Sequence, residues 1–228
     1  MELTFDDKLA VLRIDDGKAN AMGPAFFDAL DHAMNQAEAE GARALVLAGR
    51  DGMFSGGLDL KLLPTLSKEG FTGFLGQFSR SVLRLHGLPI PTVAALTGHA
   101  IAGGAILAYA CDKRFMAAGP YKLQLNETAL GMAMPAWMIQ VARSVVPRHL
   151  EAQALLHARA FSPEAALGEN LIDGIEIDAG RTLSRAIGAA RALGELSMPA
   201  YAQTKRRLRG PAIAAALAGL DHDLATLG

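Results

Sequence analysis

Two short, mainly apolar segments constrain the fold of this chain more than any other feature of its sequence. They are Ala44–Ala48 (ALVLA) and Thr92–Leu96 (TVAAL), and a glycine-rich stretch follows each of them. A strand with one face in water alternates apolar and polar residues, whereas a continuous apolar run of this length is typical of a strand covered on both faces. The two segments therefore predict buried strands in the centre of an α/β fold.

Helices and further strands are predicted on both sides of these segments. Pro24–Ala39 has proline in its first turn and apolar residues at helical spacing, and Ser162-Pro163-Glu164 is typical of a helix start. Strands that alternate with helices indicate an α/β core over residues 1–194, followed by a C-terminal helical region over residues 195–228. The remaining predicted elements are strands at Leu9–Ile14, Arg114–Ala117, Leu123–Leu125 and Ile175–Ile177, and helices over 71–86, from about Ala102, over most of the chain after Pro135, over 182–193 and from 199 to the end.

The composition of the 228 residues argues against several classes of protein. A formal net charge of −1 provides no general attraction to nucleic acid or to an anionic membrane. The single cysteine, Cys111, permits no disulfide framework, and the six histidines lack the spacing of a metal site. The sequence shows no signal-peptide pattern, no long apolar run, and none of the motifs GxGxxG, GxxxxGK(S/T) and GxSxG. We therefore expect a soluble cytoplasmic protein without a metal ion, a nucleic-acid partner or a membrane partner.

Two glycine-rich loops follow the predicted buried strands and lead toward helices. The first contains Phe54–Lys61 (FSGGLDLK), and the second contains Gly98–Gly104 (GHAIAGG). The first turn of a helix carries N–H groups without intrahelical partners, and glycine leaves such groups accessible because it has no side chain. Two such donors aimed at one point would form an oxyanion hole. The alternative is structural, since glycines between a strand and a helix commonly serve tight turns and close packing.

Three segments of the chain carry a family resemblance. FSGGLDLK resembles the motif F-x-x-G-x-D-x-K of the crotonase superfamily, which contains the enoyl-CoA hydratases and isomerases, and GHAIAGGAILAYACD resembles that family's second glycine-rich loop. NETALGM, with Pro135 beyond it, resembles a third motif, P-E-x-x-x-G followed by a proline. The motifs occur in family order within a resemblance that extends over Leu9–Leu193. It implies a crotonase-like spiral of repeated ββα units, an acyl-CoA thioester as substrate, no separate cofactor, and a homotrimer or a dimer of trimers.

The same resemblance implies roles for particular residues. The backbone N–H groups of Leu58 and Gly103 would hold the thioester oxygen, and Glu127 would be the catalytic acid and base. The residues expected to contact the substrate are Asn20, Ala21, Met22, Gly57, Leu58, Asp59, Leu60, Lys61, Gly103, Gly104, Met132 and Trp137. Further apolar candidates for the acyl pocket are Phe71, Phe74, Phe78, Met134 and Met138. The cationic candidates for contact with coenzyme A are Lys18, Lys61 and the cluster Lys205–Arg207.

One position distinguishes the reactions of this family. In the hydratases two glutamates hold a water molecule, and the position of the first, three residues beyond Gly103, is occupied here by Ile106. A single glutamate, Glu127, beside an oxyanion hole suits a Δ3,Δ2-enoyl-CoA isomerase, which shifts a double bond by removing one proton and returning it. An apolar acyl pocket would also raise the pKa of Glu127 toward the range useful for such a base.

Three other functions stay open at this point. A hydratase could recruit a second acid from elsewhere, with Glu69 as the candidate. A non-catalytic protein that binds acyl-CoA esters would fit Ile106 and the altered third motif, in which Asn126 replaces the proline. A serine peptidase of related spiral fold would use Ser55 as nucleophile, although no motif places a histidine to activate that serine.

Overall fold

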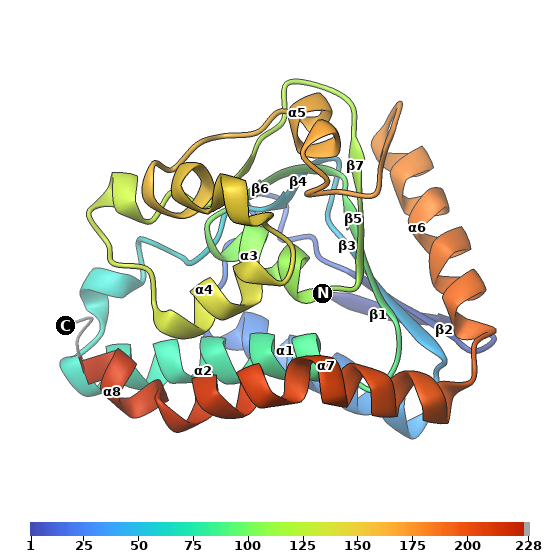
Figure 1. Cartoon of the computed structure of the whole chain (residues 1–228), viewed down its shortest axis with the longest axis horizontal. Coiled ribbons are helices and arrows are strands. Elements are labelled where there is room, and N and C mark those ends of the chain that lie inside the picture. Colours follow the sequence, from blue (N-terminus) through green and yellow to red (C-terminus); the bar gives the residue numbers. More distant parts are fainter. Residues whose placement is uncertain (226–228) are drawn as a thin grey trace.

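The chain forms two sheets surrounded by helices (Figure 1). The computed structural model describes residues 1–225. The large sheet contains, in spatial order, β1 (Glu2–Asp6), β2 (Leu9–Arg13), β3 (Ala44–Ala48), β5 (Thr92–Leu96), β7 (Lys113–Ala117) and β9 (Gly174–Glu176). The small sheet contains β4 (Gly52–Ser55), β6 (Gly98–Ile101) and β8 (Leu123–Gln124). The helices are α1 (Pro24–Ala39), α2 (Lys68–Gly87), α3 (Gly103–Ala110), α4 (Ala136–Arg143), α5 (Pro163–Gly168), α6 (Ala179–Gly194), α7 (Met198–Ala218) and α8 (Leu220–Ala225).

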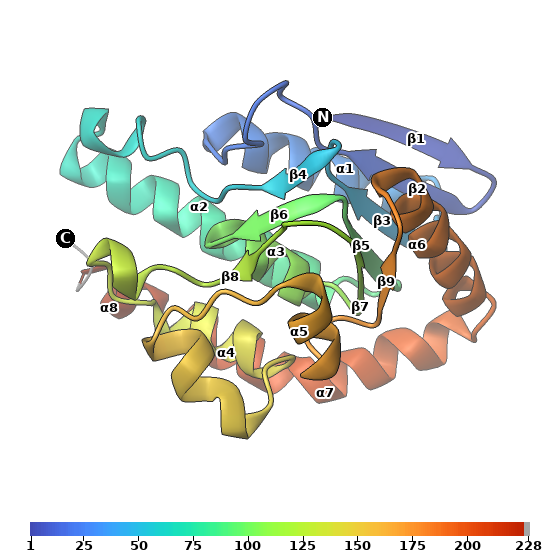
Figure 2. The same ribbon diagram turned by 90° about the horizontal axis from the view of Figure 1, so that it is seen from above.

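The chain alternates between the two sheets in a repeating order. β3 of the large sheet is followed by β4 of the small sheet and then by α2, and β5, β6 and α3 repeat this order. β7 and β8 begin a third repeat that leads to α4. Apart from the antiparallel pair β1–β2, the paired strands of both sheets are parallel, and Figure 2 shows β4, β6 and β8 side by side. The structure is therefore the α/β spiral of ββα units expected from the sequence.

The central strands are buried on both faces, as their sequences predict. Leu45 and Leu47 of β3 belong to the main core, whereas Val46 between them packs in a second cluster with Ala186 and Ala190 of α6. Successive side chains of a strand point to opposite faces, so a strand covered on both faces requires an apolar residue at every position. In Figure 1, α6 lies on one side of the large sheet, and α1, α2 and α3 lie on the other.

The C-terminal helices pack on the core of the same chain. α6 ends at Gly194, where the sequence predicts the start of the C-terminal region, and α7 then runs along α2 and α4. Lys205 of α7 binds Asp112 at 2.8 Å, and Arg209 binds the other oxygen of the same carboxylate at 2.7 Å. The prediction that helices fill this region is confirmed through residue 225, and the part of it that falls on residues 226–228 lies outside the described residues.

Three strands and several helix ends differ from the predictions. β1, β4 and β6 lie in segments for which the sequence predicts no strand, and β4 and β6 occupy parts of the two glycine-rich loops. β4 and β6 are only four residues long, and they are stabilised by pairing with their neighbours in the small sheet rather than by a local apolar pattern. The helices predicted over 71–86 and 182–193 begin earlier, after Ser67 and Asp178, whose side chains cap the helices by accepting backbone hydrogen bonds.

Candidate active site

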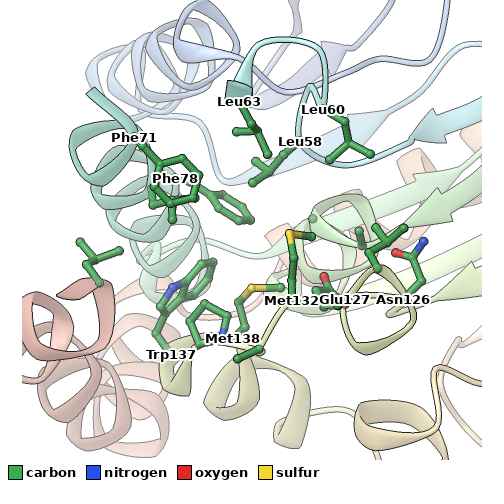
Figure 3. Close-up of a pocket in the computed structure, with 18 of the residues that line it drawn as sticks. Leu58, Leu60, Leu63, Phe71, Phe78, Asn126, Glu127, Met132, Trp137 and Met138 are labelled. Atoms are coloured by element: carbon green, nitrogen blue, oxygen red, sulfur yellow. The ribbon is translucent and has the colours of Figure 1, made fainter. Parts of the chain in front are cut away.

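The three sequence motifs meet at one edge of the small sheet. Gly56–Leu58 follows β4, Ala102–Gly103 follows β6, and Asn126–Glu127 lies just beyond β8. Since the three strands are parallel neighbours, the segments that leave their carboxyl ends are brought together, which is where parallel sheets commonly bind ligands. All three segments contribute to the wall of one cavity of about 420 Å³ (Figure 3).

The wall of this cavity is polar at one end and apolar at the other. Figure 3 shows Asn126 and Glu127 on one side, while Phe71, Phe78 and Trp137 lie together on the opposite side. The remaining lining residues are Gly56, Leu58, Leu60, Leu63, Leu75, Ala102, Gly103, Leu130, Gly131, Met132, Ala133, Pro135, Met138 and Leu224. A cavity of this size and composition, with few polar groups, is suited to a small ligand that has an apolar part.

Gly57 brings the first loop against the start of α3. Its φ is +90°, and a Cβ atom placed on it would lie 3.0 Å from the carbonyl oxygen of Ile101 and 3.1 Å from the backbone nitrogen of Gly103. Both the positive φ and the crowding exclude an L side chain at this position. The loop after β4 and the turn after β6 therefore touch through their backbones.

Two backbone N–H groups at this junction have no hydrogen-bond acceptor among residues 1–225. The residues on either side of Leu58 are hydrogen-bonded to Met22. The Gly57 carbonyl accepts from the Met22 N–H, and the Asp59 N–H donates to the Met22 carbonyl. The Leu58 N–H between them donates to no group within the described residues. Gly103 is the first residue of α3, so its N–H has no intrahelical acceptor. Leu58 and Gly103 both line the cavity, so each brings a free backbone donor to its wall.

A strained residue turns the chain from β6 into α3. Ala102 has φ +51° and ψ −122°, a conformation that residues with a side chain adopt at a cost of about 1–3 kcal/mol. Its N–H donates to the carbonyl of Gln124 at 2.8 Å, and its carbonyl accepts from Ile106 at 3.1 Å. These bonds hold the strained turn, and Gly103 follows it directly at the cavity wall. No pattern in the sequence indicates this strain.

The adjacent glycines at the start of α3 serve different purposes. A Cβ atom on Gly104 would lie 2.3 Å from the carbonyl oxygen of Ser55, so only glycine allows α3 to begin against β4. A Cβ atom on Gly103 would meet the ring of Phe78 at 3.2 Å and the sulfur of Met22 at 3.4 Å, and it would stand beside the free N–H. Close packing therefore requires Gly104, and the accessibility of a donor requires Gly103.

Glu127 is the acid of this cavity. Its side chain is only 5% exposed, and its Oε2 atom has no hydrogen-bond partner within the described part of the chain. Burial removes water from the carboxylate and raises the pKa of Glu127 from 4.5 to about 7. A carboxyl group with this pKa is present in both protonation states near neutral pH, which suits a group that must accept a proton and give it back.

Several residues predicted to bind substrate do not line the cavity. Asn20 is 1% exposed, and its amide donates to the carbonyls of Ile14, Met53 and Phe54, so the prediction that it contacts substrate is not supported. Ala21, Met22, Gly57, Asp59, Lys61 and Gly104 also lie outside the cavity wall. Within this group, the Asp59 carboxylate accepts the Lys61 N–H at 3.0 Å, which shapes the turn, and the Lys61 side chain is exposed.

The predicted apolar wall agrees in part with the structure. Phe71, Phe78, Met132, Trp137 and Met138 line the cavity as expected. Phe74 lies in the core and the half-buried Met134 packs against the core, and neither of them lines the cavity. The lining residues outside the predicted set include four leucines, Leu63, Leu75, Leu130 and Leu224. Leucine is the commonest core residue of helices, so no local signal distinguishes these four from other leucines in the chain.

Other predicted participants are engaged elsewhere. Ser55 is completely buried, and its hydroxyl donates to the carbonyl of Asn20 and accepts from the N–H of Gly57, so the hypothesis of a serine nucleophile is wrong. Lys205 is 5% exposed and bound to Asp112, so it is not the predicted contact to coenzyme A. Ile106 is fully buried in α3, and Glu69 is exposed at the start of α2 and does not line the cavity.

Comparison with known proteins identifies the family. The family model for enoyl-CoA hydratase/isomerase matches residues 4–227. This chain belongs to the enoyl-CoA hydratase/isomerase family. It is 29% identical to human mitochondrial enoyl-CoA delta isomerase 1 over 72% of this chain and 56% of that protein. It is 33% identical to a probable enoyl-CoA hydratase of Bacillus subtilis over 58% of this chain and 52% of that protein. The matches thus span about half the length of these curated relatives.

Solved structures of the family match almost the whole chain. An apo enoyl-CoA isomerase of Mycobacterium tuberculosis has a TM-score of 0.91 and 39% identity, with 98% of this chain and 97% of that chain covered. The human mitochondrial Δ3,Δ2-enoyl-CoA isomerase has a TM-score of 0.94 and 26% identity, with coverage of 99% and 89%. An enoyl-CoA hydratase of Mycobacterium ulcerans has a TM-score of 0.93 and 39% identity, with coverage of 100% and 99%. The crotonase fold is therefore shown, and the relatives carry the names of both activities.

The described residues contain neither a membrane-spanning helix nor a metal cluster. No helix within residues 1–225 combines the length and the apolar character that crossing a bilayer requires. The same residues contain no group of three or more His, Cys, Asp and Glu side chains that could hold a metal ion.

Proposed function

We propose that this protein is a Δ3,Δ2-enoyl-CoA isomerase. The observation that carries the proposal is the number of acids at the site: in the part of the chain that the structure describes, Glu127 is the one acidic residue in the cavity wall. Two free N–H groups, of Leu58 and Gly103, share that wall. One base together with an oxyanion hole is sufficient for moving a proton along an enolate.

The proposed reaction uses Glu127 twice. The ionised carboxylate takes a proton from C2 of a 3-enoyl thioester, and the electron pair of the broken C–H bond delocalises over the conjugated system onto the thioester oxygen. The N–H groups of Leu58 and Gly103 stabilise this charge, which is larger in the intermediate than in the ground state. Glu127, now protonated, gives its proton to C4, and the double bond moves from C3–C4 to C2–C3. No atom is gained or lost, and no cofactor is needed beyond the coenzyme A of the substrate.

A hydratase requires a second group to hold and activate water. Ile106 stands at the position of that group in the hydratases that the sequence resembles, and its side chain is apolar and fully buried. Glu69, the candidate replacement, is exposed and lies outside the cavity wall. These observations favour isomerisation over hydration. The raised pKa of Glu127 favours catalysis over simple binding, since a passive pocket gains nothing from burying a carboxyl group.

We also propose the homotrimer or dimer of trimers that the family resemblance implies. Leu208 of α7 is 76% exposed in the single chain, and Leu217 of the same helix is 44% exposed, which is consistent with a further protein surface covering them. Light scattering on the purified protein measures this directly, and a monomer would contradict the proposal.

The test follows the ultraviolet absorbance of the conjugated 2-enoyl thioester. We expect wild-type protein to raise this absorbance with 3-hexenoyl-CoA, and Glu127→Gln to lower kcat by about 10³-fold or more, because the amide cannot accept the proton. Glu69→Gln is the matched control, since it removes an exposed glutamate outside the cavity, and we expect it to retain full activity.

Crotonyl-CoA separates the remaining possibilities. Loss of its absorbance through addition of water, at a rate comparable with isomerisation, would contradict the proposal in favour of a hydratase. Absence of reaction with both esters, together with tight binding of acyl-CoA, would show a binding protein. Isomerisation that survives Glu127→Gln unchanged would exclude Glu127 as the base.

A further inference from the structure

We infer that Leu224 of α8 closes the apolar end of the cavity and restricts the substrate to acyl chains of medium length. This inference rests on the proposed function, because it places an acyl chain in the cavity described above. It concerns a residue near the C-terminal end of the sequence, about a hundred positions away from the catalytic glutamate.

The direction of the acyl chain follows from the two ends of the cavity. Leu60 and Leu130 line it and are 53% and 47% exposed, so the cavity opens to solvent beside them. The bulky, charged coenzyme A must remain on that open side. The thioester carbonyl is fixed between Glu127 and the free N–H groups, so the rest of the acyl chain continues toward the aromatic end, where Figure 3 shows Phe71, Phe78 and Trp137.

Tightly packed side chains close this aromatic end. Trp137 is 1% exposed, and its ring meets the ring of Phe78 edge-on at 4.9 Å between centroids. Leu224 is 6% exposed and is the one lining residue of α8 in the described part of the chain. An acyl chain that reaches this end must stop there or displace these side chains, and a well-packed interior resists such displacement.

Contacts of α8 with α2, together with a hydrogen bond to the start of α4, fix the position of Leu224. The carboxylate of Asp223 accepts the backbone N–H of Ala136 at 2.7 Å, which joins α8 to the first residue of the helix that carries Trp137. Leu220, one turn before Leu224, is 4% exposed and belongs to the main core. Leu224 and Trp137 are thus held relative to one another, so the end of the cavity is a fixed wall.

The volume sets the length of the chain. The cavity of about 420 Å³ lies toward the small end of the range for ligand pockets, about 300–1,000 Å³. The thioester and the adjoining carbons of coenzyme A take up some of this space, so the closed end leaves room for an acyl chain of limited length. The inferred substrates are therefore 3-enoyl-CoA esters of medium chain length.

The experiment measures kcat/KM for 3-enoyl-CoA esters with six to sixteen carbons. We expect wild-type values to fall at least about tenfold between ten and fourteen carbons. Leu224→Ala removes three carbon atoms from the end of the cavity and should favour longer esters. The kcat/KM for the fourteen-carbon ester, divided by that for the eight-carbon ester, should rise at least about fivefold. Leu224→Trp should fill the end and shift the preference toward six carbons.

Leu220→Ala is the matched control, because it truncates a buried leucine of the same helix that does not line the cavity. It should destabilise the protein similarly and leave the chain-length profile unchanged. A flat wild-type profile, or equal changes of profile in Leu220→Ala and Leu224→Ala, would overturn the inference.

A binding measurement separates this inference from the proposed function. Saturated acyl-CoA esters of eight and fourteen carbons can be titrated into wild-type protein by calorimetry, which requires no turnover. Weaker binding of the fourteen-carbon ester supports the inference even where isomerisation is absent, and equal or tighter binding contradicts it. An absence of isomerisation with every ester would contradict only the proposed function.

Discussion

The two walls of the cavity are built in different ways. The wall that would hold the thioester oxygen consists of backbone, namely the loop after β4 and the turn after β6, and its groups come from segments that carry recognisable motifs. The opposite wall consists of side chains from α2, α4 and α8, including Phe71, Trp137 and Leu224. The first wall depends on where side chains are absent, and the second depends on which side chains are present.

This difference decides how each wall tolerates change. A backbone donor keeps its place only while glycines permit the close approach of the surrounding segments, so substitutions there act through steric exclusion. A side-chain wall can be repacked with another apolar residue of similar volume at modest cost. We therefore expect the oxyanion hole to withstand few substitutions and the apolar wall to be the part in which relatives with different substrates differ.

Gly104→Ala should produce the largest effect. The added Cβ would lie 2.3 Å from the carbonyl oxygen of Ser55, and neither backbone can move without displacing α3 from β4. We expect a loss of stability of more than about 3 kcal/mol, seen in urea unfolding or as insoluble protein. Gly73→Ala in α2 is the control, since a Cβ there meets nothing within 4 Å, and it should leave stability unchanged or raise it by up to about 1 kcal/mol. Equal stability of the two variants would contradict the steric argument.

The same contrast explains what the sequence predicts and what it does not. Leu58, Gly103 and Glu127 stand in motifs that are visible in the sequence, so their places in the cavity wall could be predicted. Leu224 belongs to the site only because α8 packs back against α2 and the start of α4, and its own neighbourhood in the sequence carries no sign of this. The strain at Ala102 cannot be predicted either, because the turn is held in part by a hydrogen bond to Gln124 in another strand.

The fold divides in a similar manner. The strand Ala44–Ala48 can be predicted because an apolar residue at every position of so short a segment is typical of a strand covered on both faces. β4 and β6 cannot be predicted in this way, because each of them contains polar residues or glycine and becomes a strand only by pairing with its neighbours in the small sheet. Strands that are stabilised by burial of their own apolar residues can therefore be predicted from the sequence. Strands that depend on pairing with a neighbouring strand cannot.

Lys205→Met should cause the next largest loss of stability, because it removes an ion pair that anchors α7 beside the side-chain wall. Lys205 is 5% exposed and holds α7 to Asp112, which lies directly after α3 and keeps Arg209 as its other partner. Removing one cation from a buried carboxylate should cost about 3 kcal/mol in urea unfolding, with kcat of the folded enzyme retained because the backbone wall is untouched. The surface pair Arg191–Asp6 offers the control, since Arg191→Met should cost less than about 1 kcal/mol. A large fall in kcat with unchanged stability would contradict this assignment.

Glu127 lies where the two walls meet, and its pKa predicts opposite trends in activity and stability. Because the folded-state pKa is about 7 and the ordinary value is 4.5, the folded protein binds more protons between these pH values, and stability falls as the pH rises through 7. Above pH 8 the ionised carboxylate should cost about 3 kcal/mol relative to pH 4. Activity should instead rise through pH 7, since the base must be ionised.

Glu127→Gln removes this titration while keeping the shape of the side chain. The gain in stability of the variant over wild type, measured by urea unfolding, should be small at pH 5 and should grow at pH 7 and pH 9. Other titrating groups are common to both proteins and cancel in the difference. A difference that stays constant with pH would show that the carboxyl group is not desolvated as the structure indicates.

Ser55→Ala should have the smallest effect and tests whether the backbone wall needs support from a side chain. The Ser55 hydroxyl donates to the carbonyl of Asn20 at 2.8 Å and accepts the Gly57 N–H at 3.1 Å, so it holds the peptide that precedes the Leu58 donor. Its removal leaves both backbone groups buried without a partner, and we expect a loss of about 1–2 kcal/mol in stability. A slightly misplaced Leu58 N–H would stabilise the enolate less well, so kcat should fall several-fold while KM changes little. Complete loss of activity with full stability would instead indicate that Ser55 is a reacting group. An unchanged kcat would show that the hydrogen bond between Gly57 and Met22 is sufficient to position the donor.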